Sequence, residues 1–434
     1  MPTITIHRGS RTIGGSCVEI KSQGHRLVLD LGSALMESGG APLPREVETT
    51  PSVANGGLPD IPGIYRDSTP SVDALFISHA HLDHCGLLNH IHPDIPVHVS
   101  PGTLEQIRVG RIFHPGANQI HHGRFKTFHH WKSLEIGPFK VTSFLADHSG
   151  FDASSFLIET QGKRIFYSGD FRGHGRKAIL LKKLVEKPIP NIDCLLMEGT
   201  TLGGEHTMGL NSENEVEEAF YQHFAQQEDM AFTMAAGSNV DRMVSLYRAA
   251  RKADKTLVLD LYTIYLLEQL KTVSPNLPPF PGDHVRVFYI QGHAQTMVEK
   301  LGKPSLYPHM SRKIGLDEIV ENRRNMVLKL PLGAARRIAR AAIAKQPMEG
   351  AALLYSMWQG YLERDPRFMA FSKEFNIPLT HIHVSGHAQL RDLKALADAL
   401  KPRVLIPIHT LCREDYPTHF NAVKLCEDGV PLEL

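Results

Sequence analysis

The chain has 434 residues, enough for two or three domains with sizeable hydrophobic cores. Its 47 lysines and arginines nearly balance its 46 aspartates and glutamates, so the formal charge of +1 excludes a uniformly basic or acidic protein. No apolar run approaches the roughly 20 residues of a membrane span, and the first residues lack the apolar core of a signal peptide. Five cysteines without a Cys-x-x-Cys pair indicate reduced thiols, so we expect a cytoplasmic protein without a membrane partner.

The first informative segment is the apolar run 74–77, which leads into His79-Ala80-His81-Leu82-Asp83-His84. Residues i and i+2 at the end of a strand point the same way, so His79 and His81 can converge on one ion. The turn after them brings Asp83 and His84 to a second position. Nitrogen and mixed nitrogen–oxygen donors suit zinc, with Mn²⁺ as an alternative. A solvated histidine-rich loop is the competing interpretation, and the density of ligands after a buried strand favours the metal.

Three further ligand candidates follow short apolar runs in the same way. The run 141–145 leads to His148, the run 164–167 to Asp170, and the run 403–408 to His409. One polar residue at a strand end is usually a cap or a turn residue. Because α/β sheets collect ligands at the carboxyl ends of their strands, several such residues together indicate one site.

A long insertion separates these ligands, because His409 comes 239 positions after Asp170. Within it, helix-like segments (215–221 and 241–252) alternate with strand-like segments (230–234, 256–260 and 285–290). Alternating helices and strands predict parallel βαβ units. We therefore expect a self-contained α/β domain inserted into the fold that carries the ligands.

Two features of the insertion could contact phosphate. The stretch 312–345 carries nine basic and three acidic residues, net +6, which indicates either a phosphate-backbone track or the solvated face of Ala-rich helices. Ser238 and Asn239 link a strand to a helix, where backbone N–H groups favour anions. Either residue could equally be only an N-cap.

Two further candidates for functional residues lie near the two ends of the insertion. Glu198 ends the apolar strand that starts near Asp193, and His387 lies in the run His381-Ile382-His383-Val384-Ser385-Gly386-His387. A helix-like segment, 390–400, then separates His387 from the strand that leads to His409.

The His-x-His-x-Asp-His segment and the later strand-end residues resemble the metallo-β-lactamase superfamily, whose members fold as a four-layer αβ/βα sandwich. The resemblance implies that His79, His81 and His148 hold one metal ion. It implies that Asp83, His84 and His409 hold a second ion, and that Asp170 bridges the pair. Two ions about 3.5–4 Å apart can share a bridging hydroxide and stabilise the attacking and leaving oxygens of a phosphoryl-type displacement.

The order of Glu198, His387 and His409 around an insertion resembles the β-CASP nuclease branch, which includes ribonuclease J and the pre-mRNA 3′-end cleavage endonuclease. Glu198 then matches motif A, His387 motif B and His409 motif C. The implied domains are a metallo-β-lactamase domain in two parts, 1–200 and 376–434, and an inserted α/β β-CASP domain, 201–375. The implied catalytic residues are Asp83, His387 and Glu198, with Ser385 and Gly386 as phosphate donors.

Two segments depart from the ribonuclease J pattern. That family continues motif C with Gly-Glu, whereas Thr410-Leu411-Cys412-Arg413 follows His409 here. Its Gly-Ser-Gln-Gly-Glu segment corresponds only to Ser356-Met357-Trp358-Gln359-Gly360-Tyr361. Only 25 residues follow His409, too few for the C-terminal domain of the long bacterial enzymes, so neither cleavage polarity nor dimerisation through that domain carries over.

The expected function is a two-zinc ribonuclease that acts endo- or exonucleolytically on single-stranded RNA, with a metal-bridging hydroxide as nucleophile. A homo-oligomer is compatible with the sequence. A DNA nuclease of the Artemis type is the first alternative, but that branch typically has Val where this chain has His387. A small-ester or thioester hydrolase would not need the long insertion. A catalytically inactive scaffold protein would not need every ligand position to be occupied.

Overall fold

The structure is a computed structural model that describes residues 1–434 except 38–39, 42, 115–119, 121–122, 205–209, 279–281 and 283. The chain divides into two compact units. The discontinuous unit comprises Met1–His206 and Gly386–Leu434, and the inserted unit comprises Thr207–Ser385. From the sequence we expect the domain limits at residues 200 and 375, and these limits stay a prediction.

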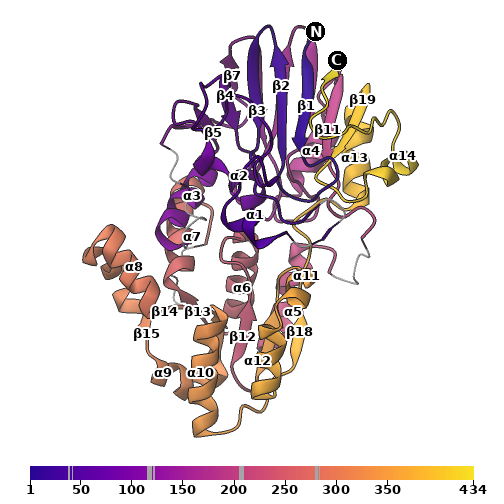
Figure 1. The fold of residues 1–434 in the computed structure, drawn as a ribbon. Helices are drawn as coiled ribbons and strands as arrows, with labels where there is room; N and C mark the ends of the chain where they lie inside the picture. The colour runs from indigo at the N-terminus through magenta and orange to yellow at the C-terminus, as the bar shows by residue number, and fades with distance from the viewer. Residues whose placement is uncertain are drawn as a thin grey trace. The chain divides into compact units, whose positions relative to one another are not determined.

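The discontinuous unit contains two sheets (Figure 1). The order of the first sheet is β20 (Leu432–Glu433), β1 (Thr3–Arg8), β2 (Cys17–Ser22), β3 (His25–Leu29), β4 (Ala74–Phe76), β5 (Val97–Val99) and β6 (Phe125–Thr127). The order of the second is β19 (Val404–Ile408), β11 (Cys194–Glu198), β10 (Lys163–Tyr167), β9 (Ser154–Thr160), β8 (Phe139–Leu145) and β7 (Ser133–Ile136). Its helices are α1 (Arg45–Thr49), α2 (Leu82–Cys85), η1 (Leu88–His90), α3 (Pro101–Phe113), α4 (Ile179–Glu186), α13 (Leu390–Leu400), η5 (Arg413–Asp415) and α14 (Tyr416–His419).

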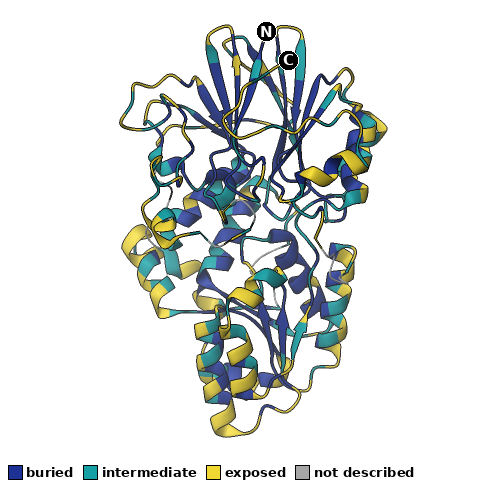
Figure 2. Ribbon diagram, turned by 45° about the vertical axis from the view of Figure 1, so that its right-hand side comes forward, coloured by how far each residue is buried: buried dark blue, intermediate teal, exposed yellow. Residues whose placement is uncertain are grey.

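Three hydrophobic clusters arrange this unit in four layers. The central cluster joins the two sheets, because Leu27 and Phe76 of the first sheet pack with Phe156 and Ile406 of the second. A second cluster covers the outer face of the first sheet and includes Ile107 of α3, and a third packs α4 and α13 on the second sheet. In Figure 2 the strands of the sheets are coloured as buried, whereas the helices that cover them are exposed on one face. The predicted αβ/βα sandwich is confirmed.

The inserted unit is built on one parallel sheet, as the alternation of segments predicted. Its order is β15 (Lys313–Ile314), β14 (Val285–Phe288), β13 (Thr256–Asp260), β16 (Met326–Lys329), β12 (Ala231–Met234), β17 (Ala352–Tyr355) and β18 (Leu379–His381). The accompanying helices are α5 (Glu213–Ala225), α6 (Val240–Lys252), α7 (Leu261–Val273), α8 (Gln291–Leu301), η3 (Lys303–Arg312), α9 (Leu316–Glu321), η4 (Arg323–Asn325), α10 (Leu332–Lys345), α11 (Gln359–Arg364) and α12 (Arg367–Phe375).

Most basic residues of the stretch 312–345 have partners inside the inserted unit. The Arg323 side chain is buried against the Asp229 carboxylate, and Lys329 is buried with its Nζ 2.7 Å from Thr263 Oγ1. Two further arginines share Glu374, at 3.0 Å for Arg336 and 2.9 Å for Arg340. These contacts favour a structural role for the stretch over a phosphate track.

No helix among the described residues is both long and apolar enough to cross a lipid bilayer.

Glu19 forms the main ionic contact in the first sheet of the discontinuous unit. Its carboxylate lies 2.7 Å from His7 Nε2 and accepts hydrogen bonds from Arg26 at 2.6 and 3.0 Å. Burial disfavours the charged form, but the hydrogen bonds from His7 and Arg26 outweigh it and lower the pKa of Glu19 to about 2. The carboxylate is therefore ionised wherever the protein is folded at ordinary pH.

Replacing Glu19 with Gln should lower the thermal unfolding midpoint at pH 7, because Arg26 loses its buried counter-charge at a cost on the order of 3 kcal/mol. Since the folded pKa is depressed, the stabilisation is complete above the unfolded pKa and is lost as pH falls from about 4.3 towards 2. Thermal scans between pH 7 and 2.5 should show the difference between the two proteins shrinking in acid. The exposed Glu48→Gln is the matched control, and a pH-independent difference would contradict the assignment.

Candidate metal centre

Parallel strand direction brings the candidate ligands to one edge of the sandwich. In the second sheet, β10, β11 and β19 are parallel, and Glu198 is in register with Ile408. Asp170, Glu198 and His409 therefore lie at the carboxyl ends of neighbouring strands. His148 follows β8, which runs in the same direction because β8 and β10 are each antiparallel to β9. The segment His79–His84 follows β4 of the first sheet.

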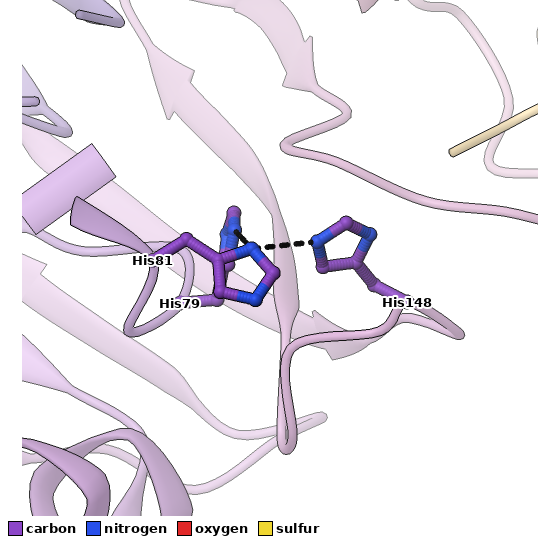
Figure 3. Close-up of side chains that lie close together, drawn as sticks. All are labelled: His79, His81 and His148. Carbon is purple, nitrogen blue, oxygen red and sulfur yellow. Dashed lines mark hydrogen bonds between the residues drawn. The ribbon is translucent and has the colours of Figure 1, made fainter. Parts of the chain in front are cut away.

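The first ligand group consists of His79, His81 and His148 (Figure 3). His81 Nδ1 lies 3.0 Å from His79 Nε2 and 3.2 Å from His148 Nε2. Burial lowers the pKa of each ring, well below the usual value for His79 and His148, so all three imidazoles are neutral at pH 7. Three neutral rings whose nitrogens converge from two loops form a set of metal donors.

The second ligand group consists of Asp83, His84, Asp170 and His409. Asp83 Oδ2 lies 3.8 Å from His84 Nε2 and 3.7 Å from His409 Nε2. Asp170 Oδ2 lies 3.1 Å from His84 Nε2 and 3.9 Å from His409 Nε2. The two groups thus bring together all seven side chains that the sequence indicated as ligands.

Asp170 lies against both groups, since its Oδ2 is also 3.8 Å from His79 Nε2 and 3.9 Å from His148 Nε2. Burial would raise the pKa of this carboxyl, but His409, His84 and His387 outweigh burial and hold the pKa well below its usual range. A buried carboxylate that contacts both sets of imidazoles is in the position that a bridging ligand requires.

Four buried polar atoms at the centre fit a bound cation. Both carboxylate oxygens of Asp170, His84 Nε2 and His409 Nε2 have no hydrogen-bond partner among the described residues. Buried polar atoms are rarely left unpaired, because each one costs about 1–3 kcal/mol. The donors are imidazole nitrogens and carboxylate oxygens, which suit a transition metal such as zinc.

Asp30 supports the second group, and the sequence reasoning missed it. Its carboxylate lies 2.8 Å from His84 Nδ1 and accepts hydrogen bonds from the Ser78 backbone at 2.6 Å and the Tyr167 hydroxyl at 2.7 Å. Because a carboxylate only accepts, His84 Nδ1 carries a proton, and Nε2 is the ring nitrogen that faces Asp170 at 3.1 Å. Asp30 follows the apolar segment 27–29, so the strand-end pattern used for the other ligands could have found it.

Backbone contacts hold two further ligands. His148 Nδ1 donates to the Gly386 carbonyl at 2.6 Å, which directs Nε2 towards His81. His409 has a positive φ of 52°, a strained conformation for a residue with a side chain, and its N–H donates to the Gly9 carbonyl at 2.7 Å. Strain of this kind persists only where the surrounding structure enforces it.

Glu198 and His387 form a separate pair beside the centre. Glu198 is fully buried, and its carboxylate accepts hydrogen bonds from the Phe171 backbone at 2.9 Å and the Thr200 hydroxyl at 2.7 Å. His387 Nδ1 lies 3.1 Å from Glu198 and 3.6 Å from Asp170. Burial lowers the pKa of His387, but Glu198 and Asp170 outweigh burial and raise it to about 9. His387 also falls in a possible third ligand group with His148 and Asp170.

The candidate phosphate donors divide between the two units. Gly386 lies in the discontinuous unit, where an added Cβ would come within 2.3 Å of Ser149 Oγ. Ser238, Asn239 and Ser385 lie in the inserted unit. Asn239 is the N-cap of α6, since its side chain accepts the Arg242 N–H at 3.1 Å. This contact supports the N-cap interpretation for Asn239, and phosphate binding by the four residues stays a prediction.

Replacing Asp30 with Asn should lower the affinity for zinc about 10–100-fold, because His84 loses the acceptor that fixes its tautomer and orientation. Competition with a chromophoric zinc chelator measures the affinity. Asp94→Asn, with a side chain 70% exposed, is the matched control and should bind zinc like the wild type. Unchanged affinity in a folded Asp30→Asn protein would show that Asp30 does not support the centre.

Comparison with known proteins places these residues in a family. The Beta-lactamase superfamily domain model matches residues 47–255, and the Zn-dependent metallo-hydrolase RNA specificity domain model matches residues 376–416. The chain is 23% identical over 368 residues to ribonuclease J of Sinorhizobium meliloti, covering 81% of the chain and 60% of that protein. It is 22% identical over 426 residues to ribonuclease J of Helicobacter pylori strain B128, covering 94% of the chain and 55% of that protein.

The chain thus spans little more than half the length of these two curated relatives. A solved structure of a protein of unknown function from Enterococcus faecalis V583 shares the fold, with a TM-score of 0.79, 22% identity and full coverage of both chains. The chain belongs to the metallo-β-lactamase superfamily, in its ribonuclease J-like β-CASP branch.

Proposed function

We propose that the protein is a two-zinc ribonuclease that hydrolyses phosphodiester bonds of single-stranded RNA. The observation that carries the proposal is the convergence of seven candidate ligand side chains in two groups, with the buried Asp170 carboxylate in contact with histidines of both. RNA is the proposed substrate because residues 376–416 match an RNA specificity domain and several relatives are named ribonuclease J. A cytoplasmic location is part of the same proposal.

His79, His81 and His148 would hold one ion, and Asp83, His84 and His409 the other, with Asp170 shared. Zinc fits these donors best, and Mn²⁺ is the alternative. When bound, the ions would supply Lewis acidity towards the phosphodiester and activate water for attack. The carboxylates of Asp83 and Asp170 would offset part of the positive charge of the two ions.

His387 and Glu198 would act on the leaving group. With His387 Nδ1 directed at Glu198, the other ring nitrogen is the one that can donate to a phosphate oxygen or to the leaving alkoxide. The raised pKa of about 9 keeps the His387 ring protonated at neutral pH, as a donor requires. Glu198 would orient the ring, and the Thr200 hydroxyl and Phe171 N–H fix Glu198 in turn. Ser385 and Gly386 would contact phosphate beside His387.

The purified protein should contain close to two transition-metal ions per chain and should lose RNA cleavage when a chelator removes them. Asp83→Ala should lower the metal content and abolish hydrolysis, because it removes a charged ligand. Elemental analysis and cleavage of 5′- and 3′-labelled RNA and DNA measure both effects.

Asp94→Ala is the control for this substitution, since it removes an exposed carboxylate instead. Full activity of metal-free protein would contradict the proposal. Cleavage of DNA in preference to RNA would assign the chain to a DNA nuclease function.

His387→Ala should keep its metal and its RNA affinity while single-turnover cleavage slows about 10²–10⁴-fold, because the donor acts in the transition state. Glu198→Gln should cause a smaller defect of the same kind, since it acts through His387. The double variant should be little slower than His387→Ala, because residues that act as a unit are non-additive.

His409→Ala is the matched comparison, because it removes a histidine that would bind metal directly and should therefore lose metal. Metal content and single-turnover rates of all four variants separate the roles. If His387→Ala strips the metal as His409→Ala does, then His387 is a ligand of the third group and not a proton donor.

A further inference from the structure

An exposed aromatic cluster lies in the inserted unit, directly after β17. It consists of Trp358, which is 48% exposed, Tyr361, which is 51% exposed, and Arg364. The chain has only two tryptophans, and one of them lies in this cluster. Large aromatic side chains that stay accessible in a folded domain mark interaction surfaces more often than packing defects.

The contacts around Trp358 hold its indole in one orientation. The Arg364 guanidinium lies over the indole, 5.6 Å from the ring centroid. Tyr361 meets it edge-on, with ring centroids 5.3 Å apart and an interplanar angle of 87°. A Cβ on Gly360 would come within 2.3 Å of the indole, so only glycine allows this close approach. The ring is therefore fixed before any ligand arrives, which lowers the entropy lost on binding.

Further rings connect the cluster to the segment that carries His387. His381 Nε2 lies 2.9 Å from the Met357 carbonyl, and the His381 and His383 rings stack at 5.7 Å with an interplanar angle of 9°. The segment Trp358–Arg364 follows β17, and His381 ends the parallel strand β18, so both leave the same edge of the sheet. The chain reaches His387 four residues after His383.

The rings and the exposed Arg364 favour a ligand with planar bases and phosphates, in a segment (363–367) that carries two acidic and two basic side chains. Asp365 is neutralised by Arg367, which contacts its two carboxylate oxygens at 2.8 and 2.6 Å, and Glu363 accepts a hydrogen bond from the Gln359 side chain at 3.1 Å. Arg364 and His381 remain exposed beside the rings. Aromatic rings flanked by arginine are how proteins bind single-stranded nucleic acid without reading its sequence, at about 1–3 kcal/mol per stacked base.

We propose that Trp358 is a stacking platform for a base of single-stranded RNA, with Arg364 as a contact to the adjoining phosphate. The assignment deepens the proposed ribonuclease function and rests on it. A base flipped out of a strand fits the exposed indole, whereas a paired base in a duplex cannot reach it. Duplex binding therefore should not depend on Trp358.

The two tryptophans allow a matched experiment. Trp131, 60% exposed, lies in the discontinuous unit, so Trp131→Leu is the control for Trp358→Leu. Each full-length variant is titrated with a phosphorothioate-linked single strand roughly 10 nucleotides long and with the corresponding duplex. In a Trp131→Phe background, Trp358 is the sole indole and reports stacking directly through quenching of its fluorescence.

We expect the single strand to quench Trp358 and Trp358→Leu to weaken single-strand binding about 5–100-fold, from one stacked base. Trp131→Leu should bind like the wild type, and Trp358→Phe should recover part of the affinity. Gly360→Val should weaken binding although the indole is retained, because the new side chain displaces it. Thermal melting of each variant checks the fold, and an exposed site should change it little.

Two results would overturn the assignment: equal affinity of Trp358→Leu and the wild type for the single strand, or equal losses on single strand and duplex. The first result would indicate that the cluster binds a protein partner or a second copy of the chain instead. The RNA cleavage assay separates this inference from the proposed function. If the protein cleaves RNA and Trp358→Leu binds the single strand like the wild type, only the stacking platform is refuted. If binding depends on Trp358 but the protein cleaves no RNA, only the ribonuclease function is refuted.

Discussion

The charge on Asp170 is the constraint on which the rest of the centre depends. A carboxylate taken out of water costs several kcal/mol unless opposite charge compensates it. Asp170 is 1% exposed, and its Oδ2 lies within 3.9 Å of five imidazoles, none of which donates a hydrogen bond to it. Five rings around one carboxylate cannot all be protonated without repelling one another. Cations bound by these side chains would resolve both difficulties at once, and burial lowers the pKa of His79, which leaves a lone pair of its ring available for them.

The sandwich supplies the rigidity that such a crowded arrangement needs. Asp170 follows β10, which lies between β9 and β11 in the sheet and is bonded to both. Behind the ligands, a second set of hydrogen bonds fixes the loops: Asp30 holds His84 and Tyr167, and Asp392 accepts the Gly173 N–H at 3.1 Å. The ligands cannot relax apart without breaking contacts to the strands on which they end. A site of this kind is already organised before metal or substrate binds.

Sequence reasoning reached the seven side chains that the structure brings together because the information was local. Each ligand follows an apolar run, and the expected strand 256–260 and helix 390–400 coincide with β13 and α13 in the structure. Asp30 follows the same local pattern, but other supporting residues have partners that are distant in the chain: Ser16 Oγ lies 2.8 Å from His409 Nδ1, across 393 positions. Composition left both interpretations of the basic stretch 312–345 open, since it does not reveal that Arg323 is buried against Asp229. A local pattern indicates which residues can bind metal, but only tertiary contacts show which residues hold them in place.

The pairing of β19 with β11 and of β20 with β1 has a consequence for how the protein is made. Both sheets are completed by strands that a ribosome adds after the inserted unit, and at about 5–20 residues per second the stretch between Asp170 and His409 takes on the order of 10–50 s to synthesise. During that time β11 and β1 present unpaired edges, which are templates for aggregation. By then the ribosome has added all three histidines of the first group, whereas the second group still lacks His409. The nascent chain therefore gains the last side chain of the second group only after the entire inserted unit has been synthesised.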